Sequence, residues 1–258
     1  SPQYYLYKKK LEIFPLSGYS SSKTINCKEN GYYSIFKSDR YGYNNPDDEW
    51  DKNEIEYLLI GDSFAKGSCV NRPDDISSVL RKLSSKSVVT TGYNSKGPLM
   101  GLASLKEYIS PKIKKVIWLY FEGNDIYNLE KELKNNFLKQ YLIDKNFSQN
   151  LKKRQNKINE IANQLIIDIL NKKKIESELV GSLNYKIKKF IKLYKTRMMI
   201  SSIFSNEISS TAEYKLNDLT EDKLTKILEN ALHISNLNNA EFYFVYLPAY
   251  ERYIDKIN

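Results

Sequence analysis

Residues 55–67 read IEYLLIGDSFAKG and combine a strand-like apolar run with a polar turn. The run from Ile55 to Ile60 is mostly apolar, is short enough for a buried strand, and is stopped by Gly61. Residues 87–91 and 115–121 form two further runs of this kind. Strands that stay apolar along their length are typical of a parallel sheet that is covered by helices on both faces.

Helical patterns separate these predicted strands. Residues 75–83 and 98–109 carry apolar side chains at the spacing of a helix. The first of these helices is predicted from Ile76, Val79, Leu80 and Leu83. After a long interval, residues 221–235 predict another helix with Thr220 as its N-cap, and residues 241–247 predict a fourth strand. The alternation predicts an α/β fold, a three-layer α/β/α flavodoxin-like domain with a parallel sheet.

Two segments depart from this alternation. Residues 1–50 are rich in Tyr, Ser, Asn and Lys, and we interpret them as an N-terminal extension that packs on the core. Residues 51–258 form the predicted α/β domain. Within it, residues 126–220 show helical patterns and no convincing strand, which predicts a helical insertion. Apolar stripes at 158–169 and 187–194 indicate that its helices bury one face.

The positive charge is concentrated in this insertion. The whole chain has 40 basic and 31 acidic residues, a net charge of +9. Residues 131–200 hold 17 basic and 6 acidic residues, so this stretch alone carries +11. Such a segment can attract nucleic acid, anionic lipid or acidic polysaccharide, but no zinc finger, basic zipper or RNA-binding signature accompanies it. We therefore interpret the lysines as a solvated helix face and predict no nucleic-acid partner.

Composition excludes several other classes of protein. A hydrophobic fraction of 41% argues against a disordered chain, and no apolar run approaches the 18 residues that a membrane-spanning helix needs. The two cysteines, Cys27 and Cys69, lack any C-x-x-C or Cys/His spacing, so no metal site is predicted. Whether they form a disulfide is left open, because secreted chains pair their cysteines and cytosolic chains do not.

Unusual polar residues follow three of the predicted strands. Gly61-Asp62-Ser63 follows the first, residues 92–98 (GYNSKGP) follow the second, and Gly123-Asn124-Asp125 follows the third. The carboxyl ends of neighbouring strands in an open parallel sheet share one crevice, where ligands bind. The fold therefore predicts that a serine, a glycine-rich turn and an asparagine converge on one site.

Three common loop motifs do not describe the first of these turns. A P-loop requires a lysine after its last glycine, whereas Lys66 precedes Gly67. The G-x-S-x-G elbow of α/β-hydrolases requires glycine where Ala65 stands. The G-x-G-x-x-G pattern of dinucleotide-binding loops is absent from the sequence.

The three strand ends resemble those of the SGNH or GDSL-type hydrolases. In that family a G-D-S block supplies the serine nucleophile, and Gly61-Asp62-Ser63 matches it. A G-N-D block supplies an asparagine to the oxyanion hole, and Gly123-Asn124-Asp125 matches that block. The resemblance covers residues 55–125 and 221–250. It implies Ser63 as nucleophile, the N–H groups of Ser63 and Ser95 with the Asn124 amide as oxyanion donors, and no cofactor or metal.

The chain departs from the family pattern at two points. Ser95 stands where the family has glycine, which questions the backbone dihedrals there, and Gly92 or Gly97 could take its role. The D-x-x-H block that supplies the base is also missing, because the single histidine, His233, follows Asn230 rather than an aspartate. The resemblance implies that this block and a fifth strand lie beyond Asn258 and that the 258-residue chain alone is nearly inactive.

The resulting hypothesis is a serine acyl-ester hydrolase or acyltransferase, acting on a small-molecule, O-acetylated carbohydrate or lipid ester. The alternative is a binding module that keeps the fold but has lost catalysis and holds an acylated sugar or lipid. Residues 39–45 resemble an element of envelope-polysaccharide relatives. They give a hint about the substrate. The sequence leaves the location open, with an envelope-associated or periplasmic location favoured over the cytoplasm, and it leaves the oligomeric state open as well.

Overall fold

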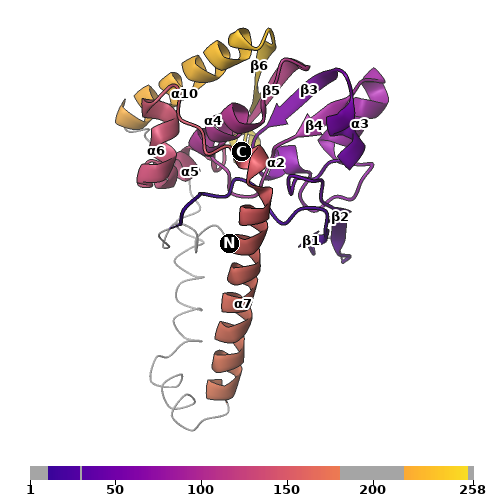
Figure 1. The fold of residues 1–258 in the computed structure, drawn as a ribbon, viewed down its shortest axis with the longest axis vertical. Helices are drawn as coiled ribbons and strands as arrows, with labels where there is room; N and C mark the ends of the chain where they lie inside the picture. Colours follow the sequence, from indigo (N-terminus) through magenta and orange to yellow (C-terminus); the bar gives the residue numbers. More distant parts are fainter. Residues whose placement is uncertain (1–10, 30, 181–217, 255–258) are drawn as a thin grey trace. The chain divides into compact units, whose positions relative to one another are not determined.

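The computed structural model describes residues 11–29, 31–180 and 218–254 (Figure 1). The chain divides into two compact units, one formed by residues 1–162 with 219–258 and the other by residues 163–218. Helix α7 (Gln155–Val180) begins in the first unit and supplies the described part of the second. The predicted stripe at 187–194 lies outside the described residues.

The first unit is built on a four-stranded parallel sheet in the order β4-β3-β5-β6 (Figure 1). Its strands are β3 (Ile55–Ile60), β4 (Val88–Thr90), β5 (Ile113–Phe121) and β6 (Glu241–Leu247). Each pairs in parallel with its neighbour. All four strands predicted from the sequence are present, and the α/β fold class with a parallel sheet is confirmed.

Helices connect these strands as the sequence predicted. Helix α3 (Ile76–Ser84) joins β3 to β4, and its N-cap Asp75 accepts a hydrogen bond from Ser78 N at 3.0 Å. Helix α4 (Pro98–Tyr108) joins β4 to β5. Helix α10 (Asp218–Leu237) precedes β6 and is helical from Asp218, so the prediction of Thr220 as its N-cap is wrong. Thr220 is 6% exposed and lies within the helix, so it is not the residue that precedes the helix.

The helices cover opposite faces of the sheet and produce three layers. Leu59 and Ile60 are successive residues of β3, so their side chains point to opposite faces. On the Ile60 face, α4 approaches so closely that a Cβ on Gly101 would lie 2.6 Å from the Trp118 ring. On the Leu59 face, Leu80 of α3 packs against a buried cluster that includes Leu59.

Short elements surround this core. Before it, β1 (Lys23–Cys27) and β2 (Ser34–Lys37) form an antiparallel hairpin, and η1 (Asp47–Asp51) leads into β3. After β5 come α5 (Asp125–Glu132), α6 (Asn136–Ile143) and η2 (Leu151–Lys153). Helices α5 and α6 pack against α4. No helix in the described parts of the chain has both the length and the apolarity needed to cross a membrane.

Candidate active site

The first strand-end loop presents Ser63 at the start of a short helix, α2 (Ser63–Lys66). Gly61 makes the turn out of β3 with φ of +154°, and an added Cβ would lie 2.7 Å from the Leu119 carbonyl oxygen. Asp62 caps the helix by accepting a hydrogen bond from Phe64 N at 2.9 Å. Its other carboxylate oxygen accepts a hydrogen bond from the Ser63 hydroxyl at 3.2 Å. The Ser63 side chain is partly exposed, and its hydroxyl is held by the hydrogen bond to Asp62.

The second loop places Ser95 in the left-handed region, with φ of +60°. This is the backbone conformation that glycine adopts most freely, so the serine reaches it at some cost in free energy. The N–H of Gly92 donates to Thr90 Oγ1 at 2.9 Å, and that of Gly97 donates to Glu132 Oε1 at 2.6 Å. Among the described residues nothing accepts the Ser95 N–H. Of the three candidate donors on this loop, Ser95 is the one still available.

The third loop orients the amide of Asn124. Asn124 directly precedes α5, and its side-chain oxygen accepts a hydrogen bond from Asn128 Nδ2 at 3.4 Å. With the oxygen engaged in this way, the Asn124 NH₂ group remains a donor. Asp125 folds back and accepts a hydrogen bond from Phe121 N at 2.9 Å, which fixes the turn after Gly123.

The sheet order brings these loops to the same edge. Because β3 lies between β4 and β5 and all three strands are parallel, Ser63, Ser95 and Asn124 follow the carboxyl ends of adjacent strands. The rings of Phe64 and Phe121 lie 4.7 Å apart between centroids, so α2 is in contact with the end of β5.

Buried acidic groups lie beneath these loops. Asp62 and Asp125 are 1% and 2% exposed. Burial, together with the nearby Asp62 carboxylate, raises the pKa of Asp125 to about 8. Burial also raises the pKa of Glu132 to about 8, although three backbone N–H groups at the start of α4 donate to it. A protonated Asp125 avoids the repulsion between two buried carboxylates.

Sequence reasoning missed the contact that joins the third loop to β6. Glu122 accepts a hydrogen bond from Ala249 N at 3.0 Å and forms an ion pair with Arg252 in α11 (Glu251–Ile254). The Arg252 guanidinium lowers the pKa of Glu122 to about 2. The two partners are 130 residues apart, and no local sequence signal links them.

His233 is placed far from this edge of the sheet. It is exposed on α10, near the end of the helix that precedes β6. A crossover helix runs antiparallel to the strands it joins, so the end of α10 lies towards the amino ends of the strands. The structure does not bring His233 to Ser63.

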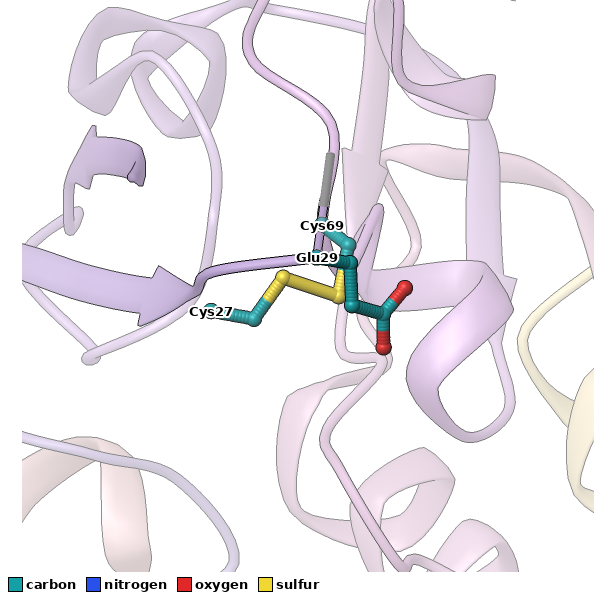
Figure 2. A group of neighbouring side chains, drawn as sticks. All are labelled: Cys27, Glu29 and Cys69. Carbon is teal, nitrogen blue, oxygen red and sulfur yellow. A yellow bond between two sulfur atoms is a disulfide. The ribbon is translucent and has the colours of Figure 1, made fainter. Parts of the chain in front are cut away.

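Cys27 and Cys69 form a disulfide with their Cα atoms 5.2 Å apart, which settles the question that the sequence left open (Figure 2). The carboxylate of Glu29 lies beside the two sulfurs. Because the sulfurs are bonded to each other, they cannot serve as two thiolate metal ligands. The disulfide fastens the end of β1 to the loop that follows α2, six residues after Ser63.

Comparison with known proteins gives limited similarity. No family model and no curated protein matches the sequence. Among solved structures, the chain is similar to AlinE4, an SGNH-hydrolase family esterase, with 16% identity and a TM-score of 0.26 over 37% of this chain and 56% of AlinE4. A mutant of the same esterase also gives 16% identity and a TM-score of 0.26, over 45% of this chain and 73% of the other. The chain thus spans about half of the length of the AlinE4 structure.

Proposed function

We propose that this protein is a serine acyl-ester hydrolase or acyltransferase with Ser63 as its nucleophile. One observation carries the proposal: a serine hydroxyl, an unused left-handed backbone N–H and an oriented amide follow three adjacent parallel strands. These are the groups that acyl transfer needs, a nucleophile and donors for the oxyanion. The proposal takes residues 1–50 as an extension of the α/β domain and residues 126–220 as its helical insertion.

The proposed chemistry follows from these groups. The Ser63 oxygen attacks the ester carbonyl, a base takes the hydroxyl proton, and the carbonyl oxygen becomes an oxyanion. The N–H groups of Ser63 and Ser95 and the Asn124 amide donate hydrogen bonds to that oxygen. The carbon–oxygen bond to the leaving alcohol then breaks, and the base returns the proton to it. Water completes hydrolysis of the acyl-enzyme, whereas a second alcohol completes acyl transfer.

The base is proposed to lie on chain beyond Asn258, on a strand that pairs with β6. Two observations support such a strand. The outer edge of β6 has no partner among the described residues. Its large apolar side chains Tyr243, Phe244 and Tyr246 are also exposed by 45%, 42% and 44%. A parallel strand beside β6 would end at the same edge of the sheet as Ser63.

The proposed substrate is an acyl ester of a carbohydrate or lipid. Residues 39–45, which suggested a polysaccharide, form a turn around Asp39, whose carboxylate accepts hydrogen bonds from Asn45 and Trp50. Asn45 also donates to Thr90 O at 2.9 Å. This stretch therefore packs against the start of the second loop, and its part in substrate choice stays a proposal.

A binding module for an acylated sugar or lipid is the second candidate. The observation that favours it is the pairing of the Ser63 hydroxyl with Asp62 rather than with a histidine. A module of this kind would use the same loops to hold the acyl group without cleaving it.

Labelling of the full-length gene product with a fluorophosphonate probe separates the two. We expect covalent labelling that disappears in Ser63→Ala, together with turnover in a panel of short- and long-chain esters. A full-length protein that is folded but shows neither labelling nor turnover at Ser63 supports the binding module instead.

A further inference from the structure

Ser68 contacts two of the three loops of the candidate site. It follows Gly67, the residue after α2, and its backbone N–H donates a hydrogen bond to the Ser63 carbonyl oxygen at 2.9 Å. Its hydroxyl donates to the side-chain oxygen of Asn94 at 2.5 Å. Asn94 directly precedes Ser95, whose N–H is the candidate oxyanion donor of the second loop. One residue therefore connects the candidate nucleophile to the neighbour of the candidate donor.

The end of α2 explains the contact between Ser68 and Ser63. Gly67 has φ of +71°, and its N–H donates to the Phe64 carbonyl oxygen at 3.0 Å. A left-handed residue after a helix turns the next backbone N–H back towards a carbonyl near the start of the last turn. A Cβ on Gly67 would lie 2.4 Å from the Asp75 Cβ, so this turn requires glycine. The turn fixes the backbone of Ser68 relative to that of Ser63.

The N-terminal hairpin anchors the chain on both sides of Ser68. Before it, the carbonyl oxygen of Gly67 accepts a hydrogen bond from Asn26 Nδ2 at 3.2 Å. After it, Cys69 is joined to Cys27 by the disulfide. Both anchors come from the end of β1. The Ser68 hydroxyl is therefore a donor in a fixed position rather than one on a freely moving loop.

The contact between Ser68 and Asn94 supports a strained part of the second loop. Ser95 is exposed and has φ of +60°, a conformation that a residue other than glycine keeps when its surroundings hold it there. On one side, Asn94 is held by the Ser68 hydroxyl. On the other side, Lys96 is buried and its Nζ donates to the Thr91 carbonyl oxygen at 2.5 Å. The backbone of Ser95 is thus held from both neighbours.

We propose that Ser68 is a positioning residue that fixes the spacing between the Ser63 hydroxyl and the Ser95 N–H during acyl transfer. The inference rests on the proposed function and deepens it. An oxyanion donor is effective when it lies roughly 2.7–3.1 Å from the position that the oxyanion takes. A misplacement of about 1 Å can cost on the order of 10²-fold in rate. Ser68 acts through Asn94 and touches no reacting atom itself.

The test measures the rate of fluorophosphonate labelling at Ser63 in the full-length protein. Ser68→Ala removes the hydroxyl, and we expect labelling to slow by about tenfold. The loss should be smaller than that of a whole donor, because the N–H of Tyr93 still donates to the Gly61 carbonyl oxygen at 3.3 Å and keeps the loop close. Ser68→Thr keeps a hydroxyl and should restore most of the rate.

Ser84→Ala is the matched control. Ser84 and Ser68 are both half-buried, and the Ser84 hydroxyl also makes a hydrogen bond, to the Leu80 carbonyl oxygen at 2.7 Å within α3. Each alanine variant loses one hydrogen bond, so both should melt about 3 °C below the wild type. Only Ser68→Ala should label slowly, whereas Ser84→Ala should match the wild type. A loss of stability alone would slow both variants alike.

A double-mutant cycle tests whether Ser68 acts through Asn94. Asn94→Ala removes the acceptor of the same hydrogen bond, so it should slow labelling about as much as Ser68→Ala does. The double variant should be no slower than either single variant, because the two changes remove one interaction. Losses that multiply in the double variant would overturn the inference.

Equal labelling rates for the wild type and Ser68→Ala would also overturn it, as would a slow Ser68→Ala whose control Ser84→Ala is equally slow. Absence of Ser63-dependent labelling in the wild type is a different result, because it would overturn the proposed function and leave Ser68 with no reaction to serve.

Discussion

Strands β3 and β6 are both apolar parallel strands, yet their side chains have different surroundings. Leu58 and Ile60 of β3 are 0% exposed, whereas Tyr243 and Tyr246 of β6 are 45% and 44% exposed. The β3 end is enclosed by α2, by neighbouring strands and by the N-terminal extension, and it carries the candidate nucleophile. At the β6 end, Arg252 forms an ion pair with Glu122 and so connects this end to the third loop. The comparison indicates that the described residues enclose the candidate site at the β3 end and leave side chains of β6 exposed.

The apolar side chains of helix α3 are likewise divided between packed and exposed positions. Of the four apolar residues that predicted it, Leu80 packs against the core. Ile76, Val79 and Leu83 are exposed by 39%, 40% and 79%. Exposed apolar side chains thus occur both on α3, which leads into β4, and on β6 at the opposite edge of the sheet.

The largest effect should follow from removing Ser63, the proposed nucleophile at the β3 end. In the full-length protein, Ser63→Ala should lower ester turnover by about 10⁴-fold or more, as loss of the nucleophile does in other serine hydrolases. Steady-state ester hydrolysis measures it, with circular dichroism as a control for folding. Unchanged turnover in the variant would move the chemistry away from the β3 end.

The next effect should come from Asn124, the proposed oxyanion donor after β5. Asn124→Ala should lower kcat on the order of 10²–10³, with KM little changed, because the amide acts on charge that develops in the transition state. Asn124→Asp is the matched variant, since it keeps the size but presents no NH₂ group to the oxyanion. If Asn124→Ala raises KM and leaves kcat unaffected, the residue binds the ground state and the oxyanion role is wrong.

Lys66, the last residue of α2, is 6% exposed, and its buried charge should give stability an unusual pH dependence. The folded-state pKa of Lys66, about 8, lies below the unfolded value of 10.5, so the unfolded chain binds more protons between these values. The free energy of unfolding of the wild type relative to Lys66→Met should therefore rise with pH across this window. The full rise should be about 3 kcal/mol, from the difference of the two pKa values. Urea unfolding of both proteins at pH 7 and pH 10 measures it, and a constant difference would contradict the burial of the charged group.

A matched pair of valines tests whether the β6 end is covered in the full-length protein. Val89 on β4 is 0% exposed, whereas Val245 on β6 is 36% exposed. Val89→Ala should cost about 2 kcal/mol of unfolding free energy, since the side chain is fully buried. If a further strand and helix cover β6, Val245→Ala should cost a similar amount in urea unfolding of the full-length protein. A cost below about 0.5 kcal/mol would show that β6 stays uncovered.

The sequence predicted the parts of this structure that depend on local patterns. Strands 55–60 and 241–247 have the predicted bounds, because a short apolar run between polar turns has few alternatives. The polar residues that follow three of these strands lie at the carboxyl ends of adjacent strands, although the strand order itself was not predicted. Contacts across long separations were not predicted: the Glu122–Arg252 ion pair joins residues 130 apart, and Lys66 is buried by side chains from the extension. No local sequence pattern around Lys66 indicates which distant segment packs against its side chain.

The smallest effect should come from Ser95, which stands in the second loop of the candidate site where the resembling family has glycine. Ser95 has φ of +60°, which costs a non-glycine residue on the order of 1 kcal/mol. Ser95→Gly relieves this strain but adds backbone freedom to the unfolded chain, which offsets part of the gain. The net result should be a stabilisation of about 0.5 kcal/mol in urea unfolding. Turnover in the full-length protein should stay within about twofold of the wild type, because the backbone N–H that would face the oxyanion is unchanged.

Ser95→Ala is the matched control, since it removes the hydroxyl and keeps the strained backbone. If Ser95→Ala loses turnover and Ser95→Gly does too, the hydroxyl rather than the N–H acts at this site, and the donor assigned to the second loop is wrong.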